Sequence, residues 1–132
     1  MSVTAKGDGR AETAMPGNVL IVEDTPIVAT AISTMLLELG IEDVTIAGSV
    51  EQGLSSLEEA RFHLAIVDLQ LGDQNGLVVA ERCADLKIPV IYSTGHGPVM
   101  VPVVYPGEAF LQKPYTLAQL KGAIEALCGQ HG

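Results

Sequence analysis

Four short apolar runs in the sequence are each followed by polar residues that serve in phosphoryl or metal chemistry. The residues at these run ends are Glu23 and Asp24, Asp68, Ser93 and Thr94, and Lys113 before Pro114. In open parallel sheets, ligands bind beyond the carboxyl ends of the strands, so these side chains are expected to meet at one edge. The predicted site contains three carboxylates, a threonine hydroxyl and a lysine ammonium.

This set of groups favours phosphoryl transfer. Three clustered carboxylates need a cation, and oxygen ligands select a hard ion such as Mg²⁺, the usual partner in phosphate chemistry. One carboxylate can then attack phosphorus and form an aspartyl phosphate. The metal and the lysine would neutralise the oxygens of the transferring group, and the threonine hydroxyl could bond the product.

Each residue also has a purely structural interpretation. Asp24 or Thr25 could cap a helix that begins at Pro26, and Asp68 could be an ordinary turn acid. Thr94 could bond loop backbone, and Lys113 could be a surface lysine. Because single short patterns mislead, the functional interpretation depends on the joint placement of these residues at the ends of four strands.

The elements that must position these residues alternate along the chain. Short apolar or β-branched runs predict strands, and apolar residues at helical spacing predict helices. Ser49, with Gln52 three residues later, forms a predicted capping box. The predicted strands are 19–22, 44–47, 64–67, 89–92 and 109–111, and the predicted helices are 26–39, a helix after Ser49 as far as Leu57, 79–86 and 117–127.

This alternation predicts an α/β fold, a doubly wound five-stranded parallel sheet of the flavodoxin-like order 2-1-3-4-5. The expected fourth helix, between Gly95 and Gly107, is predicted to be short or absent. Pro98, Pro102 and Pro106 interrupt that segment, and each interior proline removes a backbone donor.

Composition narrows the function classes. The net charge is −9, from 7 basic and 16 acidic residues, which argues against binding to nucleic acid or to an anionic membrane. No apolar run approaches the ~20 residues of a membrane span, and no secretory signal is apparent, so a cytoplasmic location is expected. Residues 1–17 are predicted to be a flexible tail before a domain spanning 18–130, and Cys83 and Cys128 to be free thiols.

Four motifs in this order resemble the receiver family of two-component response regulators, over nearly the whole chain from Asn18 to Cys128. Among the members of this family, the chain resembles the chemotaxis receivers. The shortened segment after the fourth strand is similar to divergent single-domain receivers of some alphaproteobacteria. The motifs are VLIVED at 19–24, VDLQLGDQNG at 67–76, VIYSTG at 90–95 and FLQKP at 110–114.

The resemblance implies a role for each site residue. Asp68 would accept the phosphoryl group. Mg²⁺ would be held by Asp24, by Glu23 mainly through water, by Asp68 and by the backbone carbonyl of Gln70. Lys113, before a cis peptide to Pro114, would pair with the phosphoryl group, and Thr94 would move to bond it. Gly95 would leave space for phosphoryl entry, Phe110 would be the aromatic switch residue, and Gln70 or His96 would tune dephosphorylation. Structural alternatives are a core phenylalanine at position 110 and an exposed loop histidine at 96.

The implied function is a phosphorylation-activated switch in a phosphorelay. A sensor histidine kinase or histidine phosphotransfer protein would supply the phosphoryl group, and the switch would act on a downstream protein target. No output domain is expected, and the protein is expected to be a stoichiometric acceptor rather than an enzyme.

Two other functions remain open. A dehalogenase-like phosphohydrolase would need a second acid two residues after Asp68, where this chain has Gln70. A pseudo-receiver, an interaction module that is never phosphorylated, is disfavoured by the full acidic site. The chain has no Gly-rich nucleotide-binding motif and no G-x-S-x-G elbow.

Overall fold

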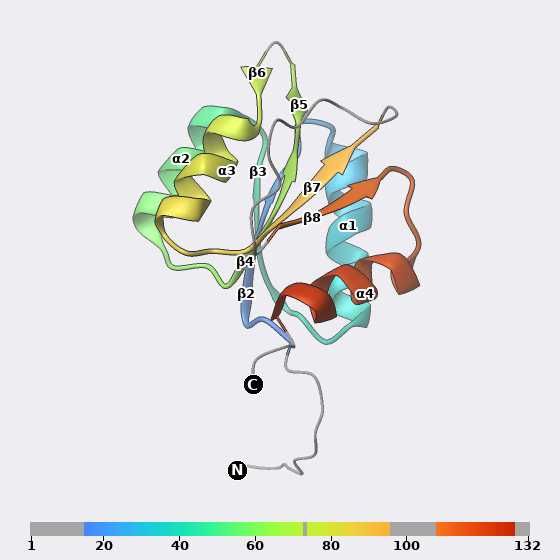
Figure 1. Ribbon diagram of the computed structural model, residues 1–132. Coiled ribbons are helices and arrows are strands. Elements are labelled where there is room, and N and C mark those ends of the chain that lie inside the picture. Colours follow the sequence, from blue (N-terminus) through green and yellow to red (C-terminus); the bar gives the residue numbers. More distant parts are fainter. Residues whose placement is uncertain (1–14, 73, 96–107, 129–132) are drawn as a thin grey trace.

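The computed structural model describes residues 15–72, 74–95 and 108–128, and its centre is a parallel sheet of five strands (Figure 1). The order across the sheet is β3-β2-β4-β7-β8, which is 2-1-3-4-5 in chain order, so the predicted fold is confirmed. The strands are β2 (Asn18–Val22), β3 (Asp43–Ala47), β4 (Leu64–Asp68), β7 (Val90–Thr94) and β8 (Glu108–Gln112).

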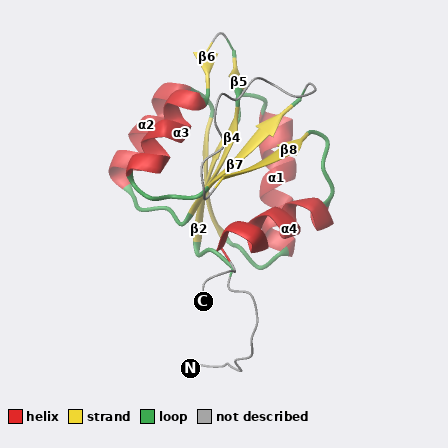
Figure 2. Cartoon of the chain, in the orientation of Figure 1, coloured by secondary structure: helices red, strands yellow, loops and turns green. Residues whose placement is uncertain are grey.

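Helices cover both faces of the sheet (Figure 2). Helices α2 (Val50–Glu59) and α3 (Leu77–Asp85) pack on one face, and α1 (Pro26–Glu38) and α4 (Leu117–Cys128) pack on the other. Because β2, β4 and β7 are buried on both faces, they consist of continuous apolar residues up to the carboxyl edge.

The start of α2 follows the predicted cap with one difference. The Gln52 N–H donates to Ser49 Oγ at 3.1 Å. The Gln52 side chain, however, accepts from the backbone N–H of Gly48 at 2.7 Å rather than from that of Ser49. The bond to Ser49 satisfies a donor that the first turn of a helix leaves unpaired, and the bond from Gly48 ties the residue before the cap to the helix.

Replacing Ser49 with alanine is expected to lower the free energy of unfolding by about 1 kcal/mol, because a methyl group cannot accept the Gln52 N–H. Chemical denaturation measures this change. Ser55→Ala, an exposed position in the same helix, is the matched control, with an expected change below about 0.5 kcal/mol. Equal losses in both variants would contradict the capping role.

The turn-rich stretch after β4 contains a small hairpin that the sequence interpretation did not include. Strands β5 (Gln70–Leu71) and β6 (Gln74–Asn75) pair antiparallel, and Gly72 has a φ of +62°, a conformation that favours glycine. A side chain at Gly76 would overlap the backbone carbonyl of Asp68. This close approach holds the hairpin against the end of β4.

Several predictions fall partly or wholly outside the described residues. These are His96, the three prolines of the predicted loop, and residues 1–14 of the predicted tail. At the first described residues, Met15 packs against the core and Pro16 is buried. Neither Cys83 nor Cys128 forms a disulfide, as predicted. Across the described ranges, no helix has the length and apolar character to cross a membrane.

Candidate functional site

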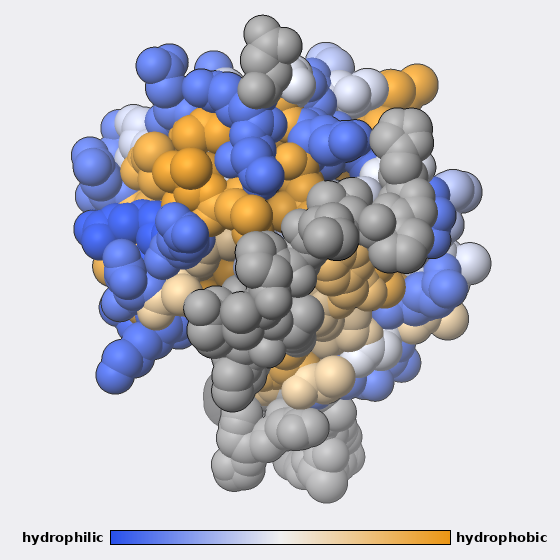
Figure 3. Space-filling view, turned by 45° about the horizontal axis from the view of Figure 1, so that its top comes forward, coloured by the Kyte–Doolittle hydropathy of each residue, from blue (hydrophilic) through white to orange (hydrophobic). Residues whose placement is uncertain are grey.

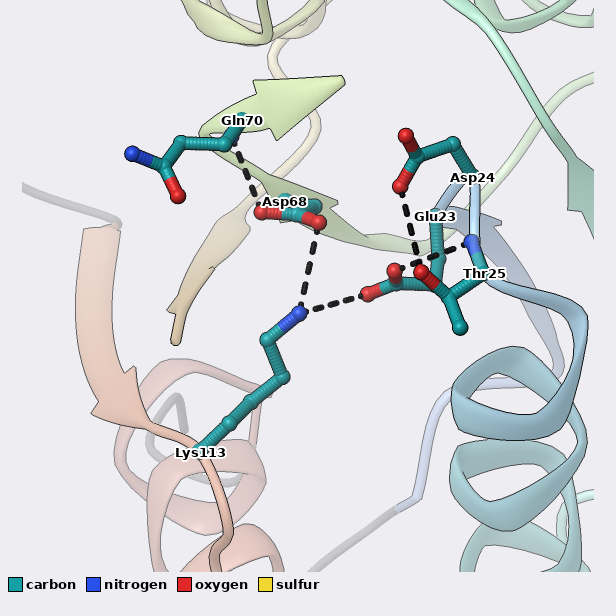
Figure 4. Close-up of polar contacts among 6 residues, drawn as sticks. All are labelled: Glu23, Asp24, Thr25, Asp68, Gln70 and Lys113. Atoms are coloured by element: carbon teal, nitrogen blue, oxygen red, sulfur yellow. Dashed lines mark hydrogen bonds and ion pairs between the residues drawn. The ribbon is translucent and has the colours of Figure 1, made fainter. Parts of the chain in front are cut away.

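Two acidic side chains and one lysine meet at the carboxyl edge of the sheet (Figure 4). Lys113 Nζ lies 2.9 Å from Glu23 Oε1 and 3.3 Å from Asp68 Oδ2. Glu23 and Asp68 are 2% and 4% exposed. Their strands, β2 and β4, are parallel neighbours in register, which places the two acids side by side although they are far apart in sequence.

Asp24 completes an acidic cluster with Glu23 and Asp68. One oxygen from each carboxylate lies within 4.8 Å of the other two, and Asp24 is exposed to solvent. Hard oxygen ligands, a partly open site and a water-accessible carboxylate suit Mg²⁺, which keeps several waters when bound. The residues present therefore fit the predicted cation.

Burial and charge shift the pKa values of the paired groups. Burial, together with the charge of Asp68, raises the pKa of Glu23 above its ordinary value of 4.5, although the hydrogen bond from Lys113 opposes this. Burial alone would lower the pKa of Lys113. The hydrogen bond to Glu23 and the negative charges of Asp68 and Glu23 outweigh burial and raise that pKa. The lysine is therefore held as a cation between two acids.

One backbone hydrogen bond orients the side chain of the predicted acceptor. Asp68 Oδ1 accepts the Gln70 N–H at 2.9 Å, which leaves Oδ2 facing Lys113. The Gln70 side chain extends away from Glu23 and Asp24 in Figure 4. Only the backbone of Gln70 thus faces Asp68.

The residues at the ends of the last two strands lie next to this cluster. Ser93 is the register partner of Asp68, and Thr94 is buried and accepts the Lys113 N–H through its carbonyl at 2.6 Å. The Lys113–Pro114 peptide bond is cis. A side chain on Gly95 would point at Lys113 Cε. The sheet thus brings the predicted site residues of all four strand ends together.

The structural alternatives for Thr25 and Phe110 have different outcomes. Thr25 is the N-cap residue of α1, but its side chain makes no capping bond, and its hydroxyl donates to Asp24 Oδ1 at 3.5 Å. Phe110 is half-buried, packs on the core, and its ring centroid lies 5.7 Å from that of Tyr92.

The sequence interpretation missed Tyr115, whose buried hydroxyl interacts with the charges of Lys113, Glu23 and Asp68. Tyr115 follows the site lysine by two residues, and this position in the sequence could have indicated that it lies near the site. It also missed a pocket of about 510 Å³ beside the site, which no local pattern indicates. This α1 pocket is lined by Ile27, Val28, Ala31, Ile32, Met35, Lys113, Pro114 and Tyr115.

Known proteins resemble this chain in sequence and in fold. A "Probable chemotaxis protein CheY" of Rhizobium etli is 31% identical over 118 residues, 84% of this chain and 92% of the relative. The solution structure of SdrG from Sphingomonas melonis has a TM-score of 0.74 at 31% identity, covering 84% of this chain and 95% of that one. PhyR from Brucella abortus has a TM-score of 0.76 at 26% identity, covering 89% of this chain but only 49% of PhyR.

The sequence model of the response regulator receiver domain matches residues 19–125. That range contains the acidic cluster, Thr94 and Lys113, and all five strands of the sheet. The chain belongs to the response regulator receiver domain family.

Proposed function

We propose that this receiver accepts a phosphoryl group on Asp68 from a phosphohistidine, with Mg²⁺, and thereby switches its contacts with another protein. The donor would be a sensor histidine kinase or a histidine phosphotransfer protein. The observation that carries the proposal is the Lys113 ammonium held between Glu23 and Asp68, beside the exposed carboxylate of Asp24. A phosphoryl group at Asp68 would meet a cation on one side and metal ligands on the other.

Each site residue has a defined part in this transfer. The bond from phosphorus to the donor imidazole breaks as a bond to an Asp68 oxygen forms, and the imidazole takes a proton from water. Glu23, Asp24, Asp68 and the Gln70 carbonyl would hold Mg²⁺, which would neutralise charge on the phosphoryl oxygens. Lys113 would neutralise the remaining charge, and the Thr94 hydroxyl would bond the product.

A stoichiometric acceptor fits the site better than a turnover phosphohydrolase. The position where that enzyme class needs a second acid is Gln70, whose side chain turns away from Glu23 and Asp24 (Figure 4). A role for Gln70 or His96 in the lifetime of the phosphoryl group, and for Phe110 as the aromatic switch, belongs to the same proposal. The divergent single-domain subtype is part of the same proposal, and the match that covers 95% of the solved SdrG chain supports it.

The test is intact-protein mass after incubation with acetyl phosphate, with and without Mg²⁺. One labile phosphoryl adduct that requires Mg²⁺ is expected. If Mg²⁺ binds and the fold is intact, yet neither acetyl phosphate nor a phosphohistidine donor gives an adduct, the chain is a pseudo-receiver. Sustained release of phosphate from an ester substrate would favour the phosphohydrolase.

The outer face of α1 is the proposed docking surface for the phosphodonor protein. From Pro26 to Leu37 this helix has no charged residue, although Ile27 is 78% and Leu37 58% exposed. In the surface view the broadest apolar area lies toward the left, the side of α2 and α3 in Figure 1, and smaller apolar areas lie among polar groups elsewhere (Figure 3). An exposed apolar surface beside a pocket is typical of a protein interface, and Lys113 links the α1 pocket to the acceptor site.

Replacing Ile27 with aspartate is expected to slow phosphotransfer from the protein donor about tenfold, the effect of losing one interface contact. Phosphorylation by acetyl phosphate, which needs no docking surface, is expected to continue. The matched control is Val78→Asp, at an exposed apolar residue of α3 on the opposite face. Equal slowing in both variants, or slowing with acetyl phosphate, would argue against docking on α1.

A further inference from the structure

Two buried hydroxyl groups beside the acidic cluster have no partner at hydrogen-bond geometry. They are Ser93 Oγ and Tyr115 Oη, here called the hydroxyl pair. Their residues are only 1% and 9% exposed. Since a buried hydroxyl without a partner destabilises a fold, the pair requires an explanation.

The hydroxyl pair lies on the same face of the sheet as the ion pairs of Lys113. Side chains alternate along a strand, and Ser93 and Asp68 each follow, by two residues, an isoleucine that packs with Tyr115 in one core cluster. Those isoleucines, Ile91 and Ile66, are register partners, as are Ser93 and Asp68. Ser93 therefore stands next to Asp68 in one row across the sheet.

Tyr115, in the loop after β8, packs on the same face of the sheet as Ser93 and Asp68. Burial raises the pKa of Tyr115, and an interaction with the Ser93 hydroxyl, too loose for a hydrogen bond of good geometry, opposes that rise. Tyr115 and Lys113 also line the same pocket, beside α1, so the phenol lies on the side of the sheet where the ammonium is held.

The lysine needs other acceptors when a metal occupies the site. An ammonium has three N–H donors, and two of those of Lys113 are directed at Glu23 and Asp68. A divalent cation at the acidic cluster would compete for those carboxylates and repel the ammonium. Within the described part of the chain, the hydroxyl pair supplies two vacant acceptors on the same face.

We propose that the hydroxyl pair of Ser93 and Tyr115 receives the Lys113 ammonium when Mg²⁺ binds the acidic cluster. The pair is a positioning device, because it acts on the metal site only through the lysine. It lowers the cost of displacing Lys113 from Glu23 and Asp68 and keeps the ammonium near the incoming phosphoryl group. The inference rests on the Mg²⁺-dependent function proposed above.

This role requires opposite effects in two states of the protein. Without metal, the hydroxyls are unpaired, so Ser93→Ala and Tyr115→Phe are expected to leave thermal stability unchanged or raise it. With Mg²⁺, each substitution removes one acceptor for the ammonium, and the Mg²⁺ dissociation constant is expected to rise about fivefold, the effect of one hydrogen bond. A purely structural role would lower stability in both states.

The experiment is calorimetric titration of the full chain with Mg²⁺ for wild type, Ser93→Ala and Tyr115→Phe, each repeated in a Lys113→Met background. The expected result is weaker binding in the single variants and no effect of either substitution once Lys113 is absent. Ser55→Ala, an exposed hydroxyl on α2, is the control and should bind as wild type does.

An unchanged dissociation constant in both single variants would overturn the proposal. Equal weakening with and without Lys113 would also overturn it, because the hydroxyls would then act on the metal independently of the lysine. If Lys113→Met does not fold, the Mg²⁺ dissociation constants of Ser93→Ala and Tyr115→Phe alone test the proposal. Acetyl phosphate labelling of the same samples separates the two proposals. If the hydroxyl pair affects Mg²⁺ binding through Lys113 but no adduct forms, only the proposed function is contradicted. If an adduct forms but the hydroxyl pair has no effect on Mg²⁺ binding, only the present inference is contradicted.

Discussion

Asp68→Asn is expected to abolish the phosphoryl adduct completely while the domain remains folded. Asparagine retains the oxygen that accepts the Gln70 N–H at 2.9 Å, so the local structure is preserved. The amide nitrogen that replaces Oδ2 is a poor nucleophile and no ligand for a hard cation. Intact-protein mass after acetyl phosphate treatment measures the loss.

The free energy of unfolding of this variant is expected to be at least as high as that of wild type at pH 7 without metal. Asp68 is one of the charges that raise the pKa of Glu23, and its removal leaves Lys113 paired with a single acid. Asp85→Asn, an exposed acid of α3, is the control and should label as wild type does. Undiminished labelling of Asp68→Asn would show that another residue is the acceptor.

Lys113→Met is expected to lower the free energy of unfolding by about 3 kcal/mol at pH 7 without metal, because removing one partner leaves buried charge unpaired. The Lys113 side chain is 19% exposed and that of Glu23 1%. The loss of stability therefore comes mainly from the buried acids that lose their partner. Urea denaturation measures the change. Lys121→Met, whose amino group lies 4.0 Å from Glu125 on an exposed helix face, is the control with an expected change below about 0.5 kcal/mol.

The loss in Lys113→Met is expected to depend on pH. Without the lysine, the pKa of Glu23 rises further, because Lys113 no longer opposes the effects of burial and of the Asp68 charge. A raised carboxyl pKa gives stability that is present below the ordinary value of 4.5 and lost as the pH rises through the folded-state pKa. The difference from wild type should therefore shrink toward pH 4.5 and be large at pH 7.

The same difference is expected to shrink at high pH. The pKa of Lys113 is raised above its ordinary 10.5, so the stability that the lysine gives wild type is present below 10.5 and lost as the pH rises through its folded-state pKa. Mg²⁺ is expected to restore about 2.7 kcal/mol to the variant at a hundred times its dissociation constant. A loss independent of both pH and Mg²⁺ would show that Lys113 acts only through packing.

The sequence by itself determined the fold and the composition of the site. Continuous apolar runs such as Val19–Val22 can only be buried on both faces, so a parallel sheet between helix layers follows from local pattern alone. Parallel strands end at the same edge, which is why Glu23, Asp68, Thr94 and Lys113 could be placed together without coordinates. The Ser49 cap could also be predicted from the sequence, because its donor and acceptor lie within one helical turn.

Only the tertiary structure decided which of these groups touch. The bonds from Lys113 to Glu23 and Asp68 join residues 90 and 45 positions apart, and strand register rather than local pattern sets their geometry. Beside the hairpin of β5 and β6, Gly76 lies so near the Asp68 backbone that a side chain would overlap its carbonyl. The α1 pocket and the hydroxyl pair form only where α1, β7 and the loop after β8 meet, because side-chain contacts between distant elements leave no periodic signal in the chain.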